Sequence, residues 1–427
     1  MNSLSVTPVV MIKLEERDRL SHLSDDLLHQ IFSGFTLKQV IQTCILSKKW
    51  RYFWTTLSVL NFNSDSLERD DSLKTIKFDH LVTQVLHRGC KNSIINTLNV
   101  IAFHQCSEMN IKAWIEIAVN RNIQTMDIRF HEPDFWSISL PTLFTCQSLK
   151  KLVLVLNMRP KGGPVRIPLP DSIDLPRLKE LSLCAVCRLS TRFLDKLFSG
   201  CRVLEMLLIT NCTFDKSQSL VITSNMLKRL VIDLCGDKYG GRKCEITIHA
   251  PTLIWFKCID WCSNNYHLDN VASLETMYLD NGRRWNVTVQ DAKRTVKWLK
   301  EISSVKSLTL HDRVFEVVSQ YLDILHRVPL SFGNLSYLNV RIQIVEDYVQ
   351  ALKCILKNSP NIKTLIVQNT WQENSTEISD GWGDGLSLQN LKCVELHSVE
   401  GFDNELGLLK GLLKNAMSLE EMTIFTS

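Results

Sequence analysis

Apolar residues recur in a fixed pattern over most of the chain. The pattern L-x-x-L-x-L, with other apolar residues allowed, begins at Ile95 and is found 13 times up to the copy at Leu419. The mean interval is 27 residues, and single intervals run from 21 to 31 residues. Intervals of about 20 to 29 residues are typical of leucine-rich repeats. Thirteen copies in near-register argue against chance recurrence in a leucine-rich chain.

Each copy predicts one short strand. In the copy Leu178–Leu183, a period of two points Leu181 and Leu183 inward and Ser182 to the other side. Cys212 occupies the Asn/Cys position that follows the strand in the repeat consensus. We expect the residues equivalent to Ser182 to line the concave face of a parallel stack: Val153, Ser182, Leu208, Val231, Lys257, Tyr278, Thr309, Asn339, Ile366, Glu395 and Thr423.

The segments between the strands predict helices where a pattern can be read. Ser190 is an expected N-cap before an apolar face that starts at Phe193, and Gly200 is an expected helix stop. Similar faces occur within residues 111–119, 348–356 and 408–416. A strand followed by a helix, repeated many times, predicts an α/β fold in which a right-handed parallel solenoid forms a horseshoe.

The first 62 residues follow a different pattern. Three short amphipathic segments are predicted to be helices, with Ser24 and Ser47 as N-caps of the first and third. Their apolar faces are expected to contain Leu27, Leu28, Ile31 and Phe32, then Val40, Ile41, Cys44 and Ile45, then Trp50, Phe53 and Trp54. The simplest structural interpretation is a cap for the solenoid, which repeat arrays need.

A family resemblance gives a second interpretation. Residues 18–28 (DRLSHLSDDLL) and 43–54 (TCILSKKWRYFW) resemble the F-box of plant-type F-box/leucine-rich-repeat proteins. Ser24 and Thr36 stand where such modules usually have proline. Proline in these places would rigidify the chain ahead of each helix.

The C-terminal part carries a related resemblance. Residues 391–396, 400–402 and 405–424, ending LLKGLLKNAMSLEEMTI, resemble the FBD module of the same family. The predicted organisation is a flexible N-terminus (residues 1–17), an F-box (18–62), a leucine-rich-repeat solenoid (63–385) and an FBD module that continues the solenoid (386–427).

The resemblance implies a substrate-recognition subunit of an SCF-type cullin-RING E3 ubiquitin ligase. The F-box would bind a Skp-type adaptor, and through it a cullin, while the repeats would bind the protein to be ubiquitinated. The residues expected to contact the adaptor are Leu23, Leu27, Ile31, Val40, Leu46 and Trp50. The alternative is a leucine-rich-repeat scaffold, or a small-molecule or hormone receptor, without ligase assembly. Trp255, Trp261, Tyr266 and Trp285 could line a small-molecule pocket or cover the convex side.

Charge and composition change the picture little. The chain has 427 residues, 49 basic and 45 acidic, so the net charge of +4 gives no field that favours nucleic acid or a membrane surface. No run of about 18 apolar residues and no secretory signal is recognisable, which predicts the cytoplasm or nucleus. The 14 Cys are then expected to be reduced thiols, mostly buried among apolar neighbours.

No catalytic, cofactor or metal residue is predicted. Cys184-x-x-Cys187 has zinc-like spacing but lacks a second ligand pair. The loop Asp380–Gly385 lacks the oxygen ligands of a calcium site. Lys48 to Arg51 are explained by the F-box pattern, and neither H-E-x-x-H nor G-x-S-x-G is present. An enzyme is therefore not expected.

Overall fold

The computed structural model describes most of the repeat region and parts of the N-terminal module. The described residues are 23–32, 34–35, 37–43, 46, 50–66, 71–89, 94–133, 135, 137–156, 165–187, 189–213, 219–233, 245–259, 265–280, 287–370 and 386–426. The segment 1–17, predicted to be flexible, lies outside these residues, as do Thr36, Ser47 and the loop 380–385.

One large parallel sheet organises the described residues. It has 14 strands in the order β1-β2-β3-β4-β6-β8-β10-β12-β14-β15-β16-β17-β18-β19, and every neighbouring pair is parallel. The strands are β1 (Val59–Asn63), β2 (Thr97–Cys106), β3 (Thr125–Pro133), β4 (Lys151–Val155), β6 (Glu180–Cys184), β8 (Met206–Thr210), β10 (Arg229–Asp233), β12 (Trp255–Ile259), β14 (Thr276–Asp280), β15 (Ser307–Leu310), β16 (Tyr337–Ile342), β17 (Thr364–Asn369), β18 (Cys393–Val399) and β19 (Glu421–Thr426).

Strands β2 to β19 of this sheet correspond one to one to the 13 predicted repeat copies, which confirms them. Strand β1 is additional, and it pairs with β2 in the register Val59↔Thr97. All but its last residue, Asn63, lies inside the range 18–62 that the sequence assigned to the helical module. The sheet therefore begins at Val59, before the predicted boundary.

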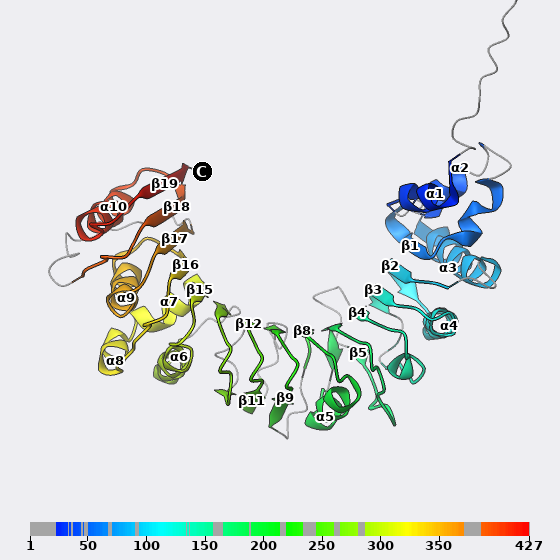
Figure 1. Cartoon of the computed structure of the whole chain (residues 1–427), viewed down its shortest axis with the longest axis horizontal. Helices are drawn as coiled ribbons and strands as arrows, with labels where there is room; N and C mark the ends of the chain where they lie inside the picture. The colour runs from blue at the N-terminus through cyan, green and yellow to red at the C-terminus, as the bar shows by residue number, and fades with distance from the viewer. Residues whose placement is uncertain are drawn as a thin grey trace, which may run out of the picture.

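Helices cover the outer side of the sheet and its N-terminal end. They are α1 (Asp25–Phe32), α2 (Leu37–Thr43), α3 (Asp71–Arg88), α4 (Glu108–Val119), α5 (Thr191–Gly200), α6 (Val289–Glu301), α7 (Asp312–Ser319), α8 (Leu322–Arg327), α9 (Glu346–Lys357) and α10 (Asp403–Asn415), with 3-10 helices η1 (Trp50–Thr56), η2 (Ser64–Ser66) and η3 (Leu143–Thr145). Figure 1 shows the sheet along the inside of an open arc, with α4 to α10 outside it and α1 and α2 at its N-terminal end. The third predicted helix of the N-terminal module is the 3-10 helix η1.

The expectation that the return segments are helical is wrong in the middle of the chain. There β9 (Leu220–Thr223), β11 (Glu245–His249) and β13 (Asn265–Leu268) form a second parallel sheet on the outer side. The repeat intervals starting at Leu204, Leu227 and Leu253 are 23, 26 and 21 residues, all below the mean of 27. Strands β9 (LVIT) and β11 (EITIH) are rich in β-branched residues, which favours strand over helix. Strands β5 (Val165–Arg166) and β7 (Val186–Cys187), which precede β9 in the chain, form a separate two-stranded sheet.

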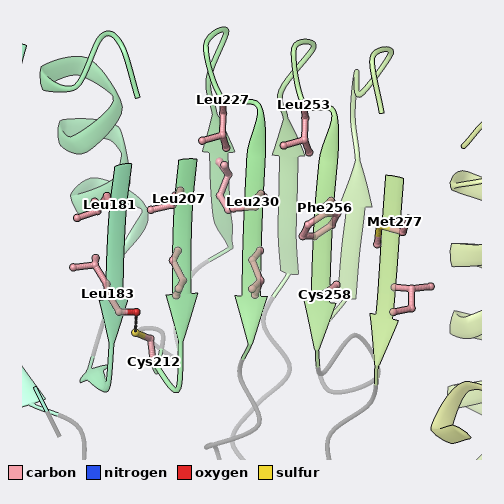
Figure 2. Packing of buried hydrophobic residues seen from close by; sticks show 14 of the residues in the cluster. Leu181, Leu183, Leu207, Cys212, Leu227, Leu230, Leu253, Phe256, Cys258 and Met277 are labelled. Carbon is pink, nitrogen blue, oxygen red and sulfur yellow. Dashed lines mark hydrogen bonds between the residues drawn. The ribbon is translucent and has the colours of Figure 1, made fainter. Parts of the chain in front are cut away.

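The core is a thin layer to which each repeat adds equivalent residues. Leu181, Leu207, Leu230, Phe256 and Met277 are aligned by strand register, and all are buried. Figure 2 shows them side by side behind the strands. Burying each such side chain contributes about 1.5–3 kcal/mol, so every repeat is stabilised mainly by its two neighbours.

Cys212 fills the consensus position that the sequence predicted for it. Its side chain is buried, and its thiol donates to the carbonyl oxygen of Leu183 at 3.5 Å (Figure 2). The thiol also lies 3.3 Å from the carbonyl oxygen of Thr210. Burial raises the pKa of this thiol to about 12. The thiol therefore stays protonated and links one repeat turn to the preceding one.

Gly200 ends α5 as predicted, although close packing is the reason. A Cβ atom on Gly200 would lie 2.0 Å from the carbonyl oxygen of Ile173. At the other end of this helix, the Ser190 hydroxyl accepts from the backbone N–H of Phe193 at 3.2 Å, as expected for an N-cap. In the part of the chain that the structure describes, no helix is long and apolar enough to cross a membrane.

Candidate protein-binding surfaces

Helix α1 has two apolar faces. Ser24 begins it as predicted, since its hydroxyl accepts from the backbone N–H of Leu27 at 3.4 Å. Leu28 and Phe32 face the core, whereas Leu27 and Ile31 are 49% and 46% exposed. Residues four apart lie on one side of a helix, so Leu27 and Ile31 form an outward apolar stripe.

The structure divides the six predicted adaptor contacts into three groups. Leu27, Ile31 and Leu46 are exposed, the last by 63%. Leu23 is partly buried against the core. Val40 and Trp50 are only 1% and 6% exposed, so they lie inside the module instead of on its surface.

Trp50 packs on Phe32 in an edge-to-face contact, with ring centroids 5.5 Å apart. Such aromatic contacts add about 0.5–1.5 kcal/mol beyond simple burial. Val40 and Trp50 therefore hold the N-terminal elements together, whereas Leu27, Ile31 and Leu46 contribute little to the core. Two further exposed side chains were not predicted, Phe35 and Ile41.

The N-terminal module is attached to the first strand of the sheet. The ring of His29 on α1 contacts Thr56, where its Nε2 lies 3.0 Å from the carbonyl oxygen and 3.1 Å from Oγ1. Thr56 is the last residue of η1, three residues before β1. The position of α1 is thus tied to the end of the solenoid.

The inner face of the sheet is a second surface. The middle residues of all 14 strands pair in one continuous row, which contains every residue predicted to line the concave face. Most keep partial exposure, and Ile366 is buried. The row is Asn61, Asn99, Asp127, Val153, Ser182, Leu208, Val231, Lys257, Tyr278, Thr309, Asn339, Ile366, Glu395 and Thr423.

The chemistry of this face changes along the row. Val153, Leu208 and Val231 make its central part mostly apolar. Beyond them, Lys257 places its Nζ atom 4.2 Å from the ring centroid of Tyr278, a cation–π contact. An apolar strip next to a charged and aromatic group is the kind of surface that a protein partner can recognise.

Tyr278 belongs to a polar cluster that the sequence did not single out. Its hydroxyl is hydrogen-bonded to Nε2 of His311, whose Nδ1 lies 3.3 Å from Oδ2 of Asp280. Burial raises the pKa of the Tyr278 phenol to about 12, and the Asp280 carboxylate adds to this rise. Burial also lowers the pKa of the His311 imidazole, although Asp280 acts in the opposite direction. At neutral pH both side chains are therefore uncharged.

The described residues do not bring Trp255 and Tyr266 together into a pocket, which was one of two interpretations of this aromatic group. Trp255 lies on the inner face, where the Arg229 guanidinium carbon sits 5.2 Å from its ring centroid. Tyr266 is on outer strand β13 and is buried against Trp298 of α6, with the two ring centroids 5.2 Å apart. These two rings are on opposite sides of the solenoid, while Trp261 and Trp285 lie outside the described residues.

The Cys184-x-x-Cys187 motif falls at the end of β6 and in β7. Cys184 is partly buried at the last position of its strand, and the side chain of Cys187 lies outside what the structure describes. The described residues therefore do not test whether the two thiols approach each other.

The C-terminal unit is held by one buried carboxylate. Glu405 of α10 accepts from the backbone N–H groups of Glu400 at 3.0 Å, Gly401 at 2.7 Å and Phe402 at 2.9 Å. It also accepts from Nδ2 of Asn369 on β17 at 2.8 Å. This accounts physically for Glu405 in the C-terminal sequence signature, and the positive φ of Gly401 (94°) accounts for the glycine.

Comparisons with known proteins identify two family models in the chain. The F-box domain model matches residues 20–62, and the model "FBD-associated F-box protein At5g56370, LRR repeats" matches residues 111–325, about half of the chain.

Full-length relatives come from Arabidopsis thaliana. F-box/FBD/LRR-repeat protein At5g22660 is 26% identical over 97% of this chain and 91% of its own length. F-box/FBD/LRR-repeat protein At1g51370 is 24% identical over 96% of this chain and 89% of its own. F-box/LRR-repeat protein 13 is 25% identical, with 96% and 90% covered.

Proposed function

Because the chain belongs to the plant F-box/FBD/leucine-rich-repeat family, we propose that it is a substrate-recognition subunit of an SCF-type cullin-RING E3 ubiquitin ligase. The observation that carries this proposal is the outward stripe of Leu27 and Ile31 on a module that already has its own core. A small module that exposes apolar side chains while burying others is well suited to bind a partner.

In this proposal the N-terminal module binds a Skp-type adaptor, and through it a cullin. Leu27, Ile31 and Leu46 supply the contact, joined by Phe35 and Ile41. Val40 and Trp50 act indirectly, since they fix the positions of these residues. The adaptor contact places the solenoid in the ligase, while the chemistry of ubiquitin transfer takes place on other subunits.

We further propose that the inner face binds the protein to be ubiquitinated. The apolar part of the row, from Val153 to Val231, would hold apolar side chains of the substrate. Lys257 and Arg341, which are partly exposed and exposed, would bind its acidic side chains. Parallel crossover connections are right-handed in about 98% of cases, so we expect the stack to be right-handed as well. The cytoplasm or nucleus is the expected compartment.

Complex formation with purified components tests this function. The full chain mixed with a recombinant Skp-type adaptor should elute as one complex in size-exclusion chromatography. Substituting Leu27→Asp and Ile31→Asp together should abolish that complex, whereas Leu413→Asp, at an exposed position on α10, should not.

The second candidate is a repeat scaffold or ligand receptor that does not assemble a ligase. Ser24 favours it, because the residue stands where the family usually has proline. This candidate would be preferred if the full chain bound no adaptor but still captured a specific protein or small molecule.

A further inference from the structure

Three potential ligand groups meet on the inner face, away from the apolar strip. Asp280 is the last residue of β14, and His311 and Asp312 directly follow β15. The register Leu279↔Leu310 brings these strand ends side by side. One oxygen or nitrogen atom from each of the three side chains lies within 4.8 Å of the other two.

The closest pair already has the spacing of metal ligands. Nδ1 of His311 lies 3.3 Å from Oδ2 of Asp280. Bonds of 2.0–2.1 Å in a tetrahedral zinc site place neighbouring ligand atoms about 3.3 Å apart. Asp312 is the first residue of α7, and its Oδ1 accepts from the backbone N–H of Arg313 at 2.9 Å. Its carboxylate supplies the third potential ligand of the group.

Tyr278 orients the imidazole from the other side. Its hydroxyl is hydrogen-bonded to Nε2 of His311. When Nε2 carries the proton and donates to this oxygen, Nδ1 presents its lone pair toward Asp280. Metal-binding histidines almost always have their second ring nitrogen held in this way.

We propose that Asp280, His311 and Asp312 form a binding site for a divalent transition-metal ion, best matched by Zn²⁺. An imidazole among the ligands disfavours Mg²⁺ and Ca²⁺, which prefer oxygen alone. Two carboxylates balance the charge of the ion. Three protein ligands leave one position open toward the inner face for water or for a side chain of a bound protein. This site goes beyond the proposed function, which requires no metal, and the sequence analysis predicted none.

Two positively charged side chains near the site are expected to lower its affinity for a metal ion. Lys257 stands over the ring of Tyr278, and the charge of Arg341 also acts on His311. Like charges weaken the binding of a cation. Arg341 is exposed, so Arg341→Gln should leave the fold intact and strengthen metal binding several-fold.

Titration of the metal-free full chain with Zn²⁺ and Co²⁺ tests the proposal. Because the chain has 14 Cys, the Co²⁺ absorption spectrum is needed to separate this site from thiolate sites. We expect one equivalent of Co²⁺ with visible bands but no thiolate charge-transfer band. Asp280→Asn and His311→Gln should each weaken this binding more than about 10-fold, and Tyr278→Phe by about 10-fold.

His397→Gln is the matched control. His397 also faces a carboxylate, with its Nε2 3.0 Å from Oε2 of Glu395, but no third ligand joins them among the described residues. Its substitution should leave metal affinity unchanged. The proposal is overturned if Asp280→Asn and Asp312→Asn, shown to be folded by circular dichroism, bind Zn²⁺ as tightly as the unchanged chain. It is also overturned if Co²⁺ gives only thiolate bands.

Discussion

Leu27 and Leu28 are neighbours in α1, yet their side chains serve opposite surfaces. Leu28 is 1% exposed and packs in the core with Phe32, while Leu27 points outward. Helix α1 thus packs one apolar face into the core of the N-terminal module and exposes a second apolar face. In the proposed function, this arrangement separates stability from partner binding at two adjacent positions.

Stability should respond to only one of these leucines. Leu28→Ala should lower the free energy of unfolding by about 2–4 kcal/mol, because it leaves a cavity in the core. Leu27→Ala should change it by less than about 0.5 kcal/mol. Urea denaturation followed by circular dichroism measures both. Equal losses in the two variants would contradict the assignment of the two faces.

Gly200 should not tolerate a side chain. A methyl group there meets the backbone of Ile173, so Gly200→Ala should lower the free energy of unfolding by about 2 kcal/mol. Gly333→Ala is the control, since a Cβ atom at Gly333 has no neighbour within 4 Å. The control should be neutral or slightly stabilising in the same urea titration. A neutral result at Gly200 would show that α5 does not approach Ile173 this closely.

Buried thiols should make the fold weaker in alkali. Burial raises the pKa of Cys201 and of Cys212 from 9.0 to about 12. Between these pH values the unfolded chain releases thiol protons that the folded chain keeps, so stability falls as the pH rises. For each thiol, the free energy of unfolding should fall by about 1 kcal/mol between pH 9 and pH 10.

A comparison of the unchanged chain with a variant that lacks both thiols isolates their contribution to the pH dependence of stability. Urea midpoints measured from pH 8 to pH 11 should fall less steeply for the double variant Cys201→Ala, Cys212→Ala than for the unchanged chain. Identical slopes would mean that these thiols are accessible to water.

Removing the Glu405 carboxylate should open the C-terminal loop. Glu405→Ala leaves three backbone N–H groups without their acceptor, at a cost of about 2–3 kcal/mol. Amide hydrogen exchange of the peptide that contains Gly401 and Phe402 should then become faster by about 30-fold or more. Glu405→Gln keeps one acceptor oxygen and should show a smaller effect. Unchanged exchange in the alanine variant would refute the proposed anchoring.

Much of the sheet was predictable because its signal is local. The alternation Leu181, Ser182, Leu183 identifies a strand and its buried side without further information, and the same holds for the other 12 copies. Strand β1 was missed although Leu57, Leu60 and Phe62 follow the same pattern, because these residues had been assigned to the F-box module. Helix α3 was also missed, although Phe78, Val82, Val85 and Leu86 follow a helical spacing.

The polar cluster was harder to predict because it depends on strand register. Tyr278 and His311 are 33 residues apart, and only the pairing of β14 with β15 brings them together. Aligning the repeat copies gives that register, so the signal was present in the sequence. The division between exposed Leu27 and buried Val40 was not available in this way, since it depends on how the helices of the N-terminal module pack on one another.

The affinity of the full chain for a Skp-type adaptor tests the central claim most directly. Isothermal titration calorimetry should give tight binding for the unchanged chain and at least a 30-fold loss for Leu27→Ala with Ile31→Ala, since central apolar contacts are worth about 2 kcal/mol or more. The control pair Leu413→Ala with Met417→Ala, exposed at the other end of the solenoid, should bind normally. The account would be contradicted if the unchanged chain did not bind, or if the Leu27 and Ile31 variant bound as tightly as the control.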